Sequence, residues 1–292
     1  MRVVSNQKTV ASGELSRDRL AVPTPVVAGP TPNGDESSER RKRLRVERGA
    51  KRVRAYLGGA VVVDSIAPLL VWEIPYYPTY YFHQDDVRAE LIADGGGDVR
   101  SPSRGNAKTL TVLAGGSRAV GAAARYDDSP IDELRGMVRF QWDAMEAWFE
   151  EDEQVYTHPR DPYTRVDILA SSRRVRVLLD RLVLADSASP RLLFETGLPT
   201  RYYVPRTHVR MDLLERSRTV THCPYKGRAE TWNVRVDQTL HGDLAWSYPA
   251  PLPESQKVAG LIAFYNEKLD IEVDGVLQER PTTKFSHPRR AA

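Results

Sequence analysis

A chain of 292 residues with 41% apolar and 28% charged side chains has room for about two globular domains, and this composition excludes a fibrous or wholly disordered protein. Its apolar runs are far shorter than the roughly 20 residues that a membrane-spanning helix needs, so we expect no membrane segment. The single cysteine cannot form an internal disulfide, and we see no secretory signal at the start of the chain, which together favour a cytoplasmic protein.

The first part of the chain is polar and then strongly basic. Residues 1–44 combine prolines and glycines with polar residues and lack apolar periodicity, so we interpret them as a disordered tail. Residues 40–54 hold nine basic groups and one acidic group, a charge of +8, which leaves −5 for the rest of the chain. Such a run can bind phosphate backbones, but no aromatic residues alternate with the basic ones. We therefore expect a solvated linker that leads into a first strand near Arg52, and not a nucleic-acid site.

The remainder of the chain repeats itself. Residues 52–91 align without a gap to residues 174–213, an offset of 122 residues, and 15 of these 40 positions are identical. An offset of this length indicates two copies of one domain, because solenoid repeats are much shorter. We predict a first domain over residues 45–168 and a second over residues 169–287.

Each copy is rich in short strands. Residues 52–57, 60–65 and 69–74 are β-branched or aromatic runs separated by turn residues. Strands at this spacing with little helix between them indicate antiparallel sheets, so the predicted fold class is mainly β. The main helical candidate is residues 143–151, although its counterpart in the second copy, residues 267–274, alternates like a strand.

A turn with reactive side chains marks the second copy, in the run His222-Cys223-Pro224-Tyr225-Lys226-Gly227. Pro224 suits the first central position of a turn and Gly227 its last, so we predict a strand, a turn and a strand. The turn would hold the only thiol near the Lys226 ammonium, and a nearby ammonium favours a reactive thiolate. A lone cysteine is also commonly a small buried hydrophobic residue, so both interpretations of Cys223 stay open.

Three motifs of the second copy stand out: Cys223-Pro224-Tyr225-Lys226-Gly227, Asp243-Leu244-Ala245-Trp246-Ser247-Tyr248-Pro249 and Ala263-Phe264-Tyr265-Asn266-Glu267-Lys268-Leu269-Asp270. They resemble successive motifs of the DUF427 family of domains of unknown function, which also carries a nucleotidyltransferase-type name. The resemblance covers about residues 50–286. It implies two tandem β-tent-like domains, each with two antiparallel sheets leaning together over a cleft, and no settled activity.

The first copy departs from this pattern. Ser101-Pro102-Ser103-Arg104-Gly105 stands where the second copy has the cysteine and lysine turn, and Ala124 stands in place of Trp246. Chemistry that needs a thiol, a lysine or that indole is therefore expected only in the second copy. We interpret the site of the first copy as degenerate.

An acidic residue and six aromatic residues of the second copy complete the candidate site. Glu195 is a candidate ligand-binding or proton-transferring group, but its counterpart Glu73 in the first copy also admits a structural role such as pairing with an arginine. The aromatic residues can enclose a ring or a cation, or form ordinary core. They are Tyr202, Tyr203, Trp232, Trp246, Tyr248 and Tyr265. Because side chains alternate along a strand, only one of Tyr202 and Tyr203 can face inward.

Metal chemistry is not expected. The six histidines are scattered and a Cys-x-x-Cys pair is missing, so we predict no metal and no cofactor. Gly115-Gly116-Ser117 and Asp127-Asp128 superficially resemble a nucleotidyltransferase pattern, yet two-metal catalysis needs carboxylates on one face of a strand and adjacent residues diverge. We interpret Asp243, Glu267 and Asp270 as surface carboxylates.

Two functions remain in view. The first is a cofactor-independent site in the cleft of the second domain that binds an unidentified small organic molecule, with Cys223 and Lys226 as catalytic residues if the protein is an enzyme. The alternative is a non-catalytic module that binds a small ligand or a partner. Nucleotidyl transfer rests on the family name alone. The sequence does not decide between enzyme and binder, and it leaves the oligomeric state unknown.

Overall fold

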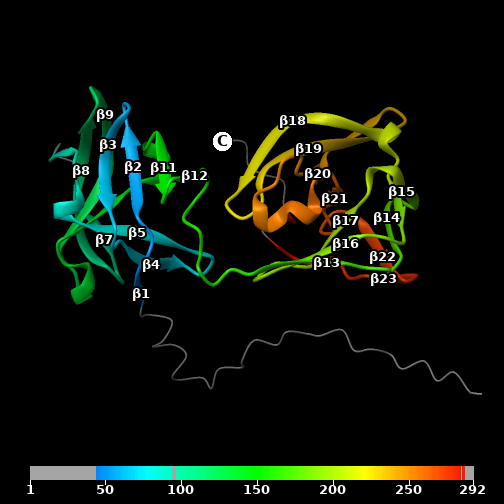
Figure 1. Ribbon diagram of the computed structural model, residues 1–292, viewed down its shortest axis with the longest axis horizontal. Coiled ribbons are helices and arrows are strands. Elements are labelled where there is room, and N and C mark those ends of the chain that lie inside the picture. Colours follow the sequence, from blue (N-terminus) through cyan, green and yellow to red (C-terminus); the bar gives the residue numbers. More distant parts are fainter. Residues whose placement is uncertain (1–43, 94–96, 284, 287–292) are drawn as a thin grey trace, which may run out of the picture. The chain divides into compact units, whose positions relative to one another are not determined.

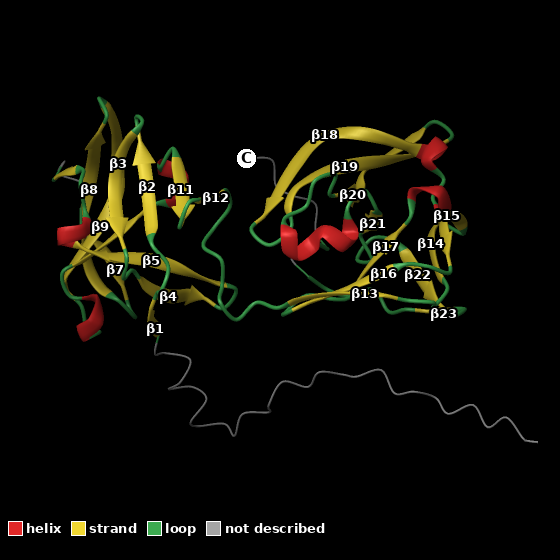
Figure 2. Cartoon of the chain, in the orientation of Figure 1, coloured by secondary structure: helices red, strands yellow, loops and turns green. Residues whose placement is uncertain are grey.

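The computed structural model describes residues 44–93, 97–283, 285 and 286. Antiparallel strands make up most of this part of the chain, with short 3-10 turns between them (Figure 1, Figure 2). The predicted tail, apart from Leu44, lies outside the described residues. Within the described residues, no helix has the length and apolar character to cross a membrane.

The first domain contains a large and a small sheet. The large sheet has the order β1-β4-β5-β10-β9-β8-β6, with β7 paired to β8. Its strands are β1 (Arg45–Arg48), β4 (Leu69–Ile74), β5 (Tyr77–His83), β6 (Glu90–Ile92), β7 (Val99–Ser101), β8 (Gly105–Ala114), β9 (Ser117–Asp128) and β10 (Met137–Phe140). The small sheet has the order β12-β11-β2-β3, formed by β2 (Val53–Leu57), β3 (Ala60–Ser65), β11 (Ala147–Glu150) and β12 (Glu153–Val155). The helical turns are η1 (Gln84–Asp86), η2 (Asp132–Leu134) and η3 (Trp142–Ala144).

The second domain repeats this arrangement. Its large sheet has the order β13-β16-β17-β21-β20-β19-β18, and its small sheet the order β15-β14-β22-β23. The large sheet consists of β13 (Val166–Ala170), β16 (Arg191–Glu195), β17 (Arg201–Val204), β18 (Leu214–Cys223), β19 (Gly227–Val236), β20 (Thr239–Ser247) and β21 (Ile262–Phe264). The small sheet consists of β14 (Val175–Leu179), β15 (Leu182–Ser187), β22 (Asp270–Val273) and β23 (Val276–Leu277). The helical turns are η4 (Arg206–His208), η5 (Met211–Leu213) and η6 (Pro253–Val258).

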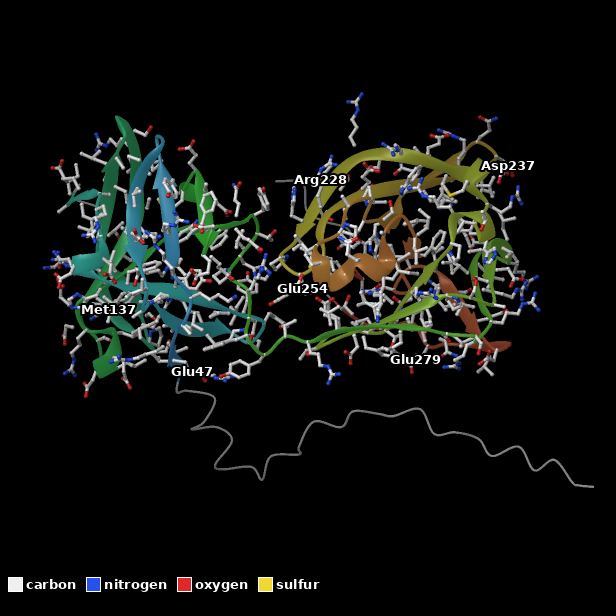
Figure 3. All side chains as sticks on the ribbon, viewed as in Figure 1. Glu47, Met137, Arg228, Asp237, Glu254 and Glu279 are labelled. Carbon is white, nitrogen blue, oxygen red and sulfur yellow. The ribbon has the colours of Figure 1, made fainter. Side chains whose placement is uncertain are left out.

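The mainly-β, tandem architecture predicted from the sequence is confirmed, and strand register preserves the repeat. Val71 pairs with Thr79 in the first domain, and Leu193 pairs with Arg201 in the second, both at the offset of 122 residues. Regular structure begins earlier than the predicted Arg52, because β1 pairs with β4 from Arg45 onward. Glu47, labelled in Figure 3, belongs to this strand.

The predicted helix over residues 143–151 is wrong. This segment forms the single turn η3 and then strand β11, which pairs with β2 on one side and β12 on the other. Trp148 and Glu150 are buried while Phe149 between them is partly exposed, which is the two-residue period of a strand. Backbone hydrogen bonds to two neighbouring strands therefore outweigh the helix-like spacing of the apolar residues.

Both faces of each large sheet are covered. In the second domain one face packs on the small sheet around Val177, Trp232 and Phe264, and the opposite face forms a separate core around Tyr203 and Trp246. The second core is closed by Ile168 of β13 and Val258 of η6. The two faces offer two different environments, and the side-chain alternation along a strand decides which one a residue enters. We call the second core the outer core of the domain.

Candidate functional site

The turn between β18 and β19 has the predicted form. Cys223 ends β18 and lies opposite Gly227, the first residue of β19. Gly227 has a φ of +89°, in the left-handed region that residues with a Cβ rarely adopt, so a glycine is required there. Gly105 holds the same place in the first domain with a φ of +84°. Arg228 follows the turn on β19 (Figure 3).

Lys226 points away from solvent and pairs with Glu195 of β16. Its Nζ lies 2.6 Å from Glu195 Oε2, and each side chain is only 8% exposed. A buried pair of this kind carries no net charge, and each partner compensates the loss of water around the other. Glu195 therefore has a partner for the structural role considered above, an ion pair, and this partner is Lys226 instead of an arginine.

Three aromatic residues lie beside this pair in the outer core. Trp246 Nε1 donates a hydrogen bond of 3.0 Å to Tyr203 Oη, and the ring of Tyr265 lies 4.5 Å from that of Trp246. Burial raises the pKa of the Tyr203 and Tyr248 phenols, and the nearby Glu195 and Cys223 raise it further. Both phenols therefore stay protonated at neutral pH and can act as hydrogen-bond donors.

Cys223 is partly buried at the edge of the outer core. It also lines a hollow of about 290 Å³ that reaches from the β18–β19 turn to the segment after β12. Tyr156 of that segment stacks on His222 with ring centroids 5.5 Å apart. Lys226 does not line this hollow. The hollow is therefore lined by the thiol and not by the ammonium, although the two residues share a turn.

The structure divides the predicted aromatic set between two faces of one sheet. Tyr203, Trp246, Tyr248 and Tyr265 belong to the outer core with Cys223. Trp232 and Tyr202 pack in the core between the two sheets, where Trp232 Nε1 donates to Ser247 Oγ at 3.3 Å. The expectation that Tyr202 and Tyr203 face opposite ways agrees with this placement. The residues that the structure brings together are Cys223, Glu195, Lys226, Tyr203, Trp246, Tyr248 and Tyr265.

A second buried ion pair was missed in the sequence. Arg201 of β17 binds Glu267 through two hydrogen bonds of 2.6 Å, with side chains 6% and 0% exposed, and it also contacts the Asn266 side chain. Its guanidinium lies 5.6 Å from the centre of the Trp246 ring. The interpretation of Glu267 as a surface carboxylate is wrong, because Arg201 compensates the loss of its hydration. The sequence signal that could have indicated this ion pair is Arg201, an arginine within a strand at the position where the first copy has Thr79.

The first domain keeps the charge pair although it lacks the thiol and the lysine. Arg104 occupies the position of Lys226 and lies 2.6 Å from Glu73, the counterpart of Glu195. A second arginine, Arg139 of β10, reaches the same carboxylate at 3.0 Å. Arg139 stands opposite Tyr81 and Ala124, where the second domain has Ala263 opposite Tyr203 and Trp246. The small Ala124 leaves the space that the arginine uses.

Neither domain brings several metal-binding side chains together. Among the residues that the structure describes, no group of three or more histidine, cysteine, aspartate or glutamate side chains could hold a metal ion. Asp127, one of the two aspartates that resemble a nucleotidyltransferase pattern, is bound by Arg125 at 2.8 Å and lies 3.4 Å from Lys108. The chemical groups that the candidate site offers are a thiol, three phenols, an indole and a neutral ion pair.

Comparison with known families agrees with the two-domain division of the chain. Residues 45–151 and 167–275 each match the model of the domain of unknown function DUF427. Comparison with the curated proteins gave no match. The first matched region contains β1 to β11, and the second runs from the second residue of β13 to beyond the end of β22. The chain therefore belongs to the DUF427 family and carries two tandem copies of its domain.

Proposed function

We propose that the protein binds a small organic molecule in the hollow beside Cys223, which is lined by the β18–β19 turn of the second domain and by β12 and the residues after it, without a metal or a cofactor. The observation that carries this proposal is that the only thiol of the chain lines a hollow of about 290 Å³, close to the volume of a small-ligand pocket. Pro224 and Leu252 give the hollow apolar walls, and Arg160 and Arg228 lie at the same hollow. A molecule with an apolar body and a polar end fits this lining.

The ion pair that Lys226 forms favours a binding function over a catalytic one. Its ammonium is 2.6 Å from the Glu195 carboxylate, so the pair presents no net positive charge to the thiol. Thiolate formation is favoured by an uncompensated cation nearby, and Lys226 does not supply one. In this proposal Lys226 and Glu195 fix the turn that carries Cys223, and Cys223 is a wall of the binding site.

Thiol catalysis is the second candidate. It is favoured by the partial exposure of Cys223 and by the protonated phenols of Tyr203 and Tyr248 close to it. In such an enzyme Cys223 would lose its proton to water and its Sγ would add to a carbonyl carbon of the ligand. The C=O π bond would open to an oxyanion, to which a phenol would donate a hydrogen bond.

Two substitutions of Cys223 separate these functions. Small molecules that co-purify with the full-length protein are released by denaturation and identified by mass spectrometry. Cys223→Trp should fill the hollow and abolish capture, whereas Cys223→Ala should retain the same molecule if the thiol is a wall. Loss of capture by Cys223→Ala, with an unchanged melting temperature and rapid native alkylation by iodoacetamide, would favour the nucleophile. Capture that survives Cys223→Trp would rule out this hollow as the site.

The basic run gives little support to a nucleic-acid function. Four of its five described basic members are bound within the chain: Arg45 to Glu47, Lys51 to Glu150, Arg52 to Asp64 and Arg54 to Asp152. Paired guanidinium and ammonium groups have less charge to offer a phosphate backbone. A reducing compartment such as the cytoplasm is part of the proposal, because it keeps the partly exposed Cys223 from forming a disulfide with another thiol.

A further inference from the structure

The first domain contains a pocket larger than the hollow beside Cys223, although its turn lacks the cysteine. The pocket has a volume of about 390 Å³ and lies at the large sheet where β5 and β10 are neighbours. Its lining includes Thr79, Arg139, Trp142, Trp148 and His158. This volume is in the range of pockets that hold small organic ligands.

One of the differences between the copies lies in the lining of this pocket. Register places Thr79 of β5, which lines the pocket, where β17 has Arg201. In the second domain the Arg201 side chain extends to Glu267 and lies near the ring of Trp246. Threonine ends at its γ atoms, so it takes up less room at this position. Asp143, three residues after β10, stands where Glu267 follows β21, and it is exposed.

The pocket walls are flat and are held in place. Trp142 stacks on Trp148 with ring centroids 4.7 Å apart and an interplanar angle of 5°, and Tyr77 stacks on His158 at 3.7 Å and 10°. Flat aromatic walls favour a planar ligand that can stack on them.

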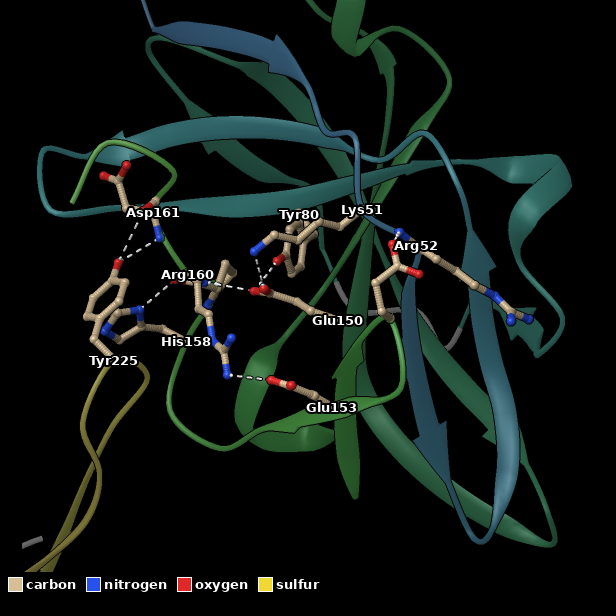
Figure 4. A network of polar contacts seen from close by, with 11 residues as sticks. Lys51, Arg52, Tyr80, Glu150, Glu153, His158, Arg160, Asp161 and Tyr225 are labelled. Atoms are coloured by element: carbon tan, nitrogen blue, oxygen red, sulfur yellow. Dashed lines mark hydrogen bonds and ion pairs between the residues drawn. The ribbon is translucent and has the colours of Figure 1, made fainter. Parts of the chain in front are cut away.

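The buried carboxylate of Glu150 fixes one side of the pocket (Figure 4). Glu150 is 4% exposed and accepts hydrogen bonds from Tyr80 Oη at 2.7 Å, the Arg160 backbone N–H at 2.9 Å and Lys51 Nζ at 2.6 Å. Tyr80 and the residues just before Arg160 line the pocket. These bonds hold the wall before any ligand arrives, which lowers the ordering cost of binding.

At one end of the pocket, where Glu73 and Arg139 line it, the cluster of Arg104, Arg139 and Glu73 carries an excess of positive charge. Arg104 and Arg139 share the one carboxylate of Glu73, and all three side chains are less than a third exposed. The second domain has one cation, Lys226, for Glu195 at this place. Asp143 also lines the pocket, but its exposure to water screens its charge. A carboxylate on the ligand would complete the hydrogen bonding of Arg139.

From these observations we propose that the first domain is a second binding site, specific for a planar aromatic molecule that bears a carboxylate. The ring stacks at Trp142 and the carboxylate pairs with Arg139. The short side chain of Thr79 leaves space for the ligand. The first domain, which lacks the thiol, would then bind a ligand of a different chemical class from the second. The proposal does not depend on the function proposed for the second domain.

Three probes with one ring and different charges test this proposal on the full chain by isothermal titration calorimetry. Indole-3-acetate should bind at least about tenfold more tightly than neutral indole-3-acetamide, and cationic tryptamine should bind most weakly. Arg139→Gln should reduce the affinity for the acid to that for the amide, and Arg139→Lys should restore part of the difference. Equal binding of acid and amide, or no binding of the acid at millimolar concentration, would overturn the proposal.

A matched pair of variants locates the binding. Thr79→Arg copies the second domain, with Asp143 available to pair with the new side chain, and should abolish binding of both acid and amide without lowering the melting temperature. Thr79→Met is a shorter filler that serves the same purpose if the arginine destabilises the fold. Thr157 lines both hollows, but Cys223 lines only the one beside the β18–β19 turn. Cys223→Trp should therefore leave the titration unchanged, which separates this site from the one proposed beside Cys223. Binding that persists in both Thr79 variants would contradict the proposed location.

Discussion

Lys226→Met is expected to destabilise the second domain by about 3 kcal/mol, because it leaves Glu195 buried without its cation. Each side chain of the pair is 8% exposed, so water cannot replace the lost ammonium. Unfolding of the full chain in urea measures the change in the free energy of unfolding. Hydrogen exchange of peptides from the second domain serves as the probe that assigns this change to that domain.

Two further variants at this pair serve as controls. The double variant Lys226→Met/Glu195→Met replaces the ion pair by apolar side chains of similar volume and should lie within about 1 kcal/mol of the original protein. Lys226→Arg should also be tolerated, since Arg104 fills the same role opposite Glu73 in the first domain. A single Lys226→Met variant as stable as the original would show that Glu195 does not depend on this cation.

Arg201→Met is expected to cost about 3 kcal/mol or more at pH 7, because Glu267 has a side chain that is 0% exposed. Burial raises the pKa of Glu267, but the hydrogen bonds from Arg201 and Thr283 outweigh it and leave the pKa below its ordinary value. The resulting stability is present above the pKa of the unfolded state and is lost as pH falls through the lower, folded pKa.

The variant should therefore show a different pH dependence. Without Arg201, the raising effect of burial on the Glu267 pKa is no longer offset by its main partner, so Glu267 is protonated more easily. The loss in the free energy of unfolding relative to the original protein should therefore shrink from pH 7 to pH 4. Urea unfolding at several pH values measures this difference. Arg210→Met is the matched control, because its pair with Asp212 is more than half exposed and should contribute less than about 1 kcal/mol. A deficit that stays constant over this pH range would mean that Glu267 is not the group left unpaired.

Much of the architecture could be predicted from the sequence because it depends on local pattern and on the repeat. The strands at residues 53–57, 60–65 and 69–74 follow from β-branched runs between turn residues, and the Cys223–Gly227 turn follows from its proline and glycine. Residues 143–151 show the limit of such reasoning. Their spacing fits a helix, and only the pairing of β11 with β2 and β12 makes them a strand.

The partners of the charged residues were decided only by the tertiary structure. Glu195 and Lys226 are 31 residues apart, and Arg201 and Glu267 are 66 apart, so no local spacing indicates that either pair is buried. The sequence by itself determined the tandem repeat, the strand-rich fold and the alternation that sends Tyr202 and Tyr203 to opposite faces. Which face carries Cys223, which ion pairs are closed to water and where Thr79 leaves a pocket depend on how strands distant in the chain pack, because burial is a property of the assembled sheets.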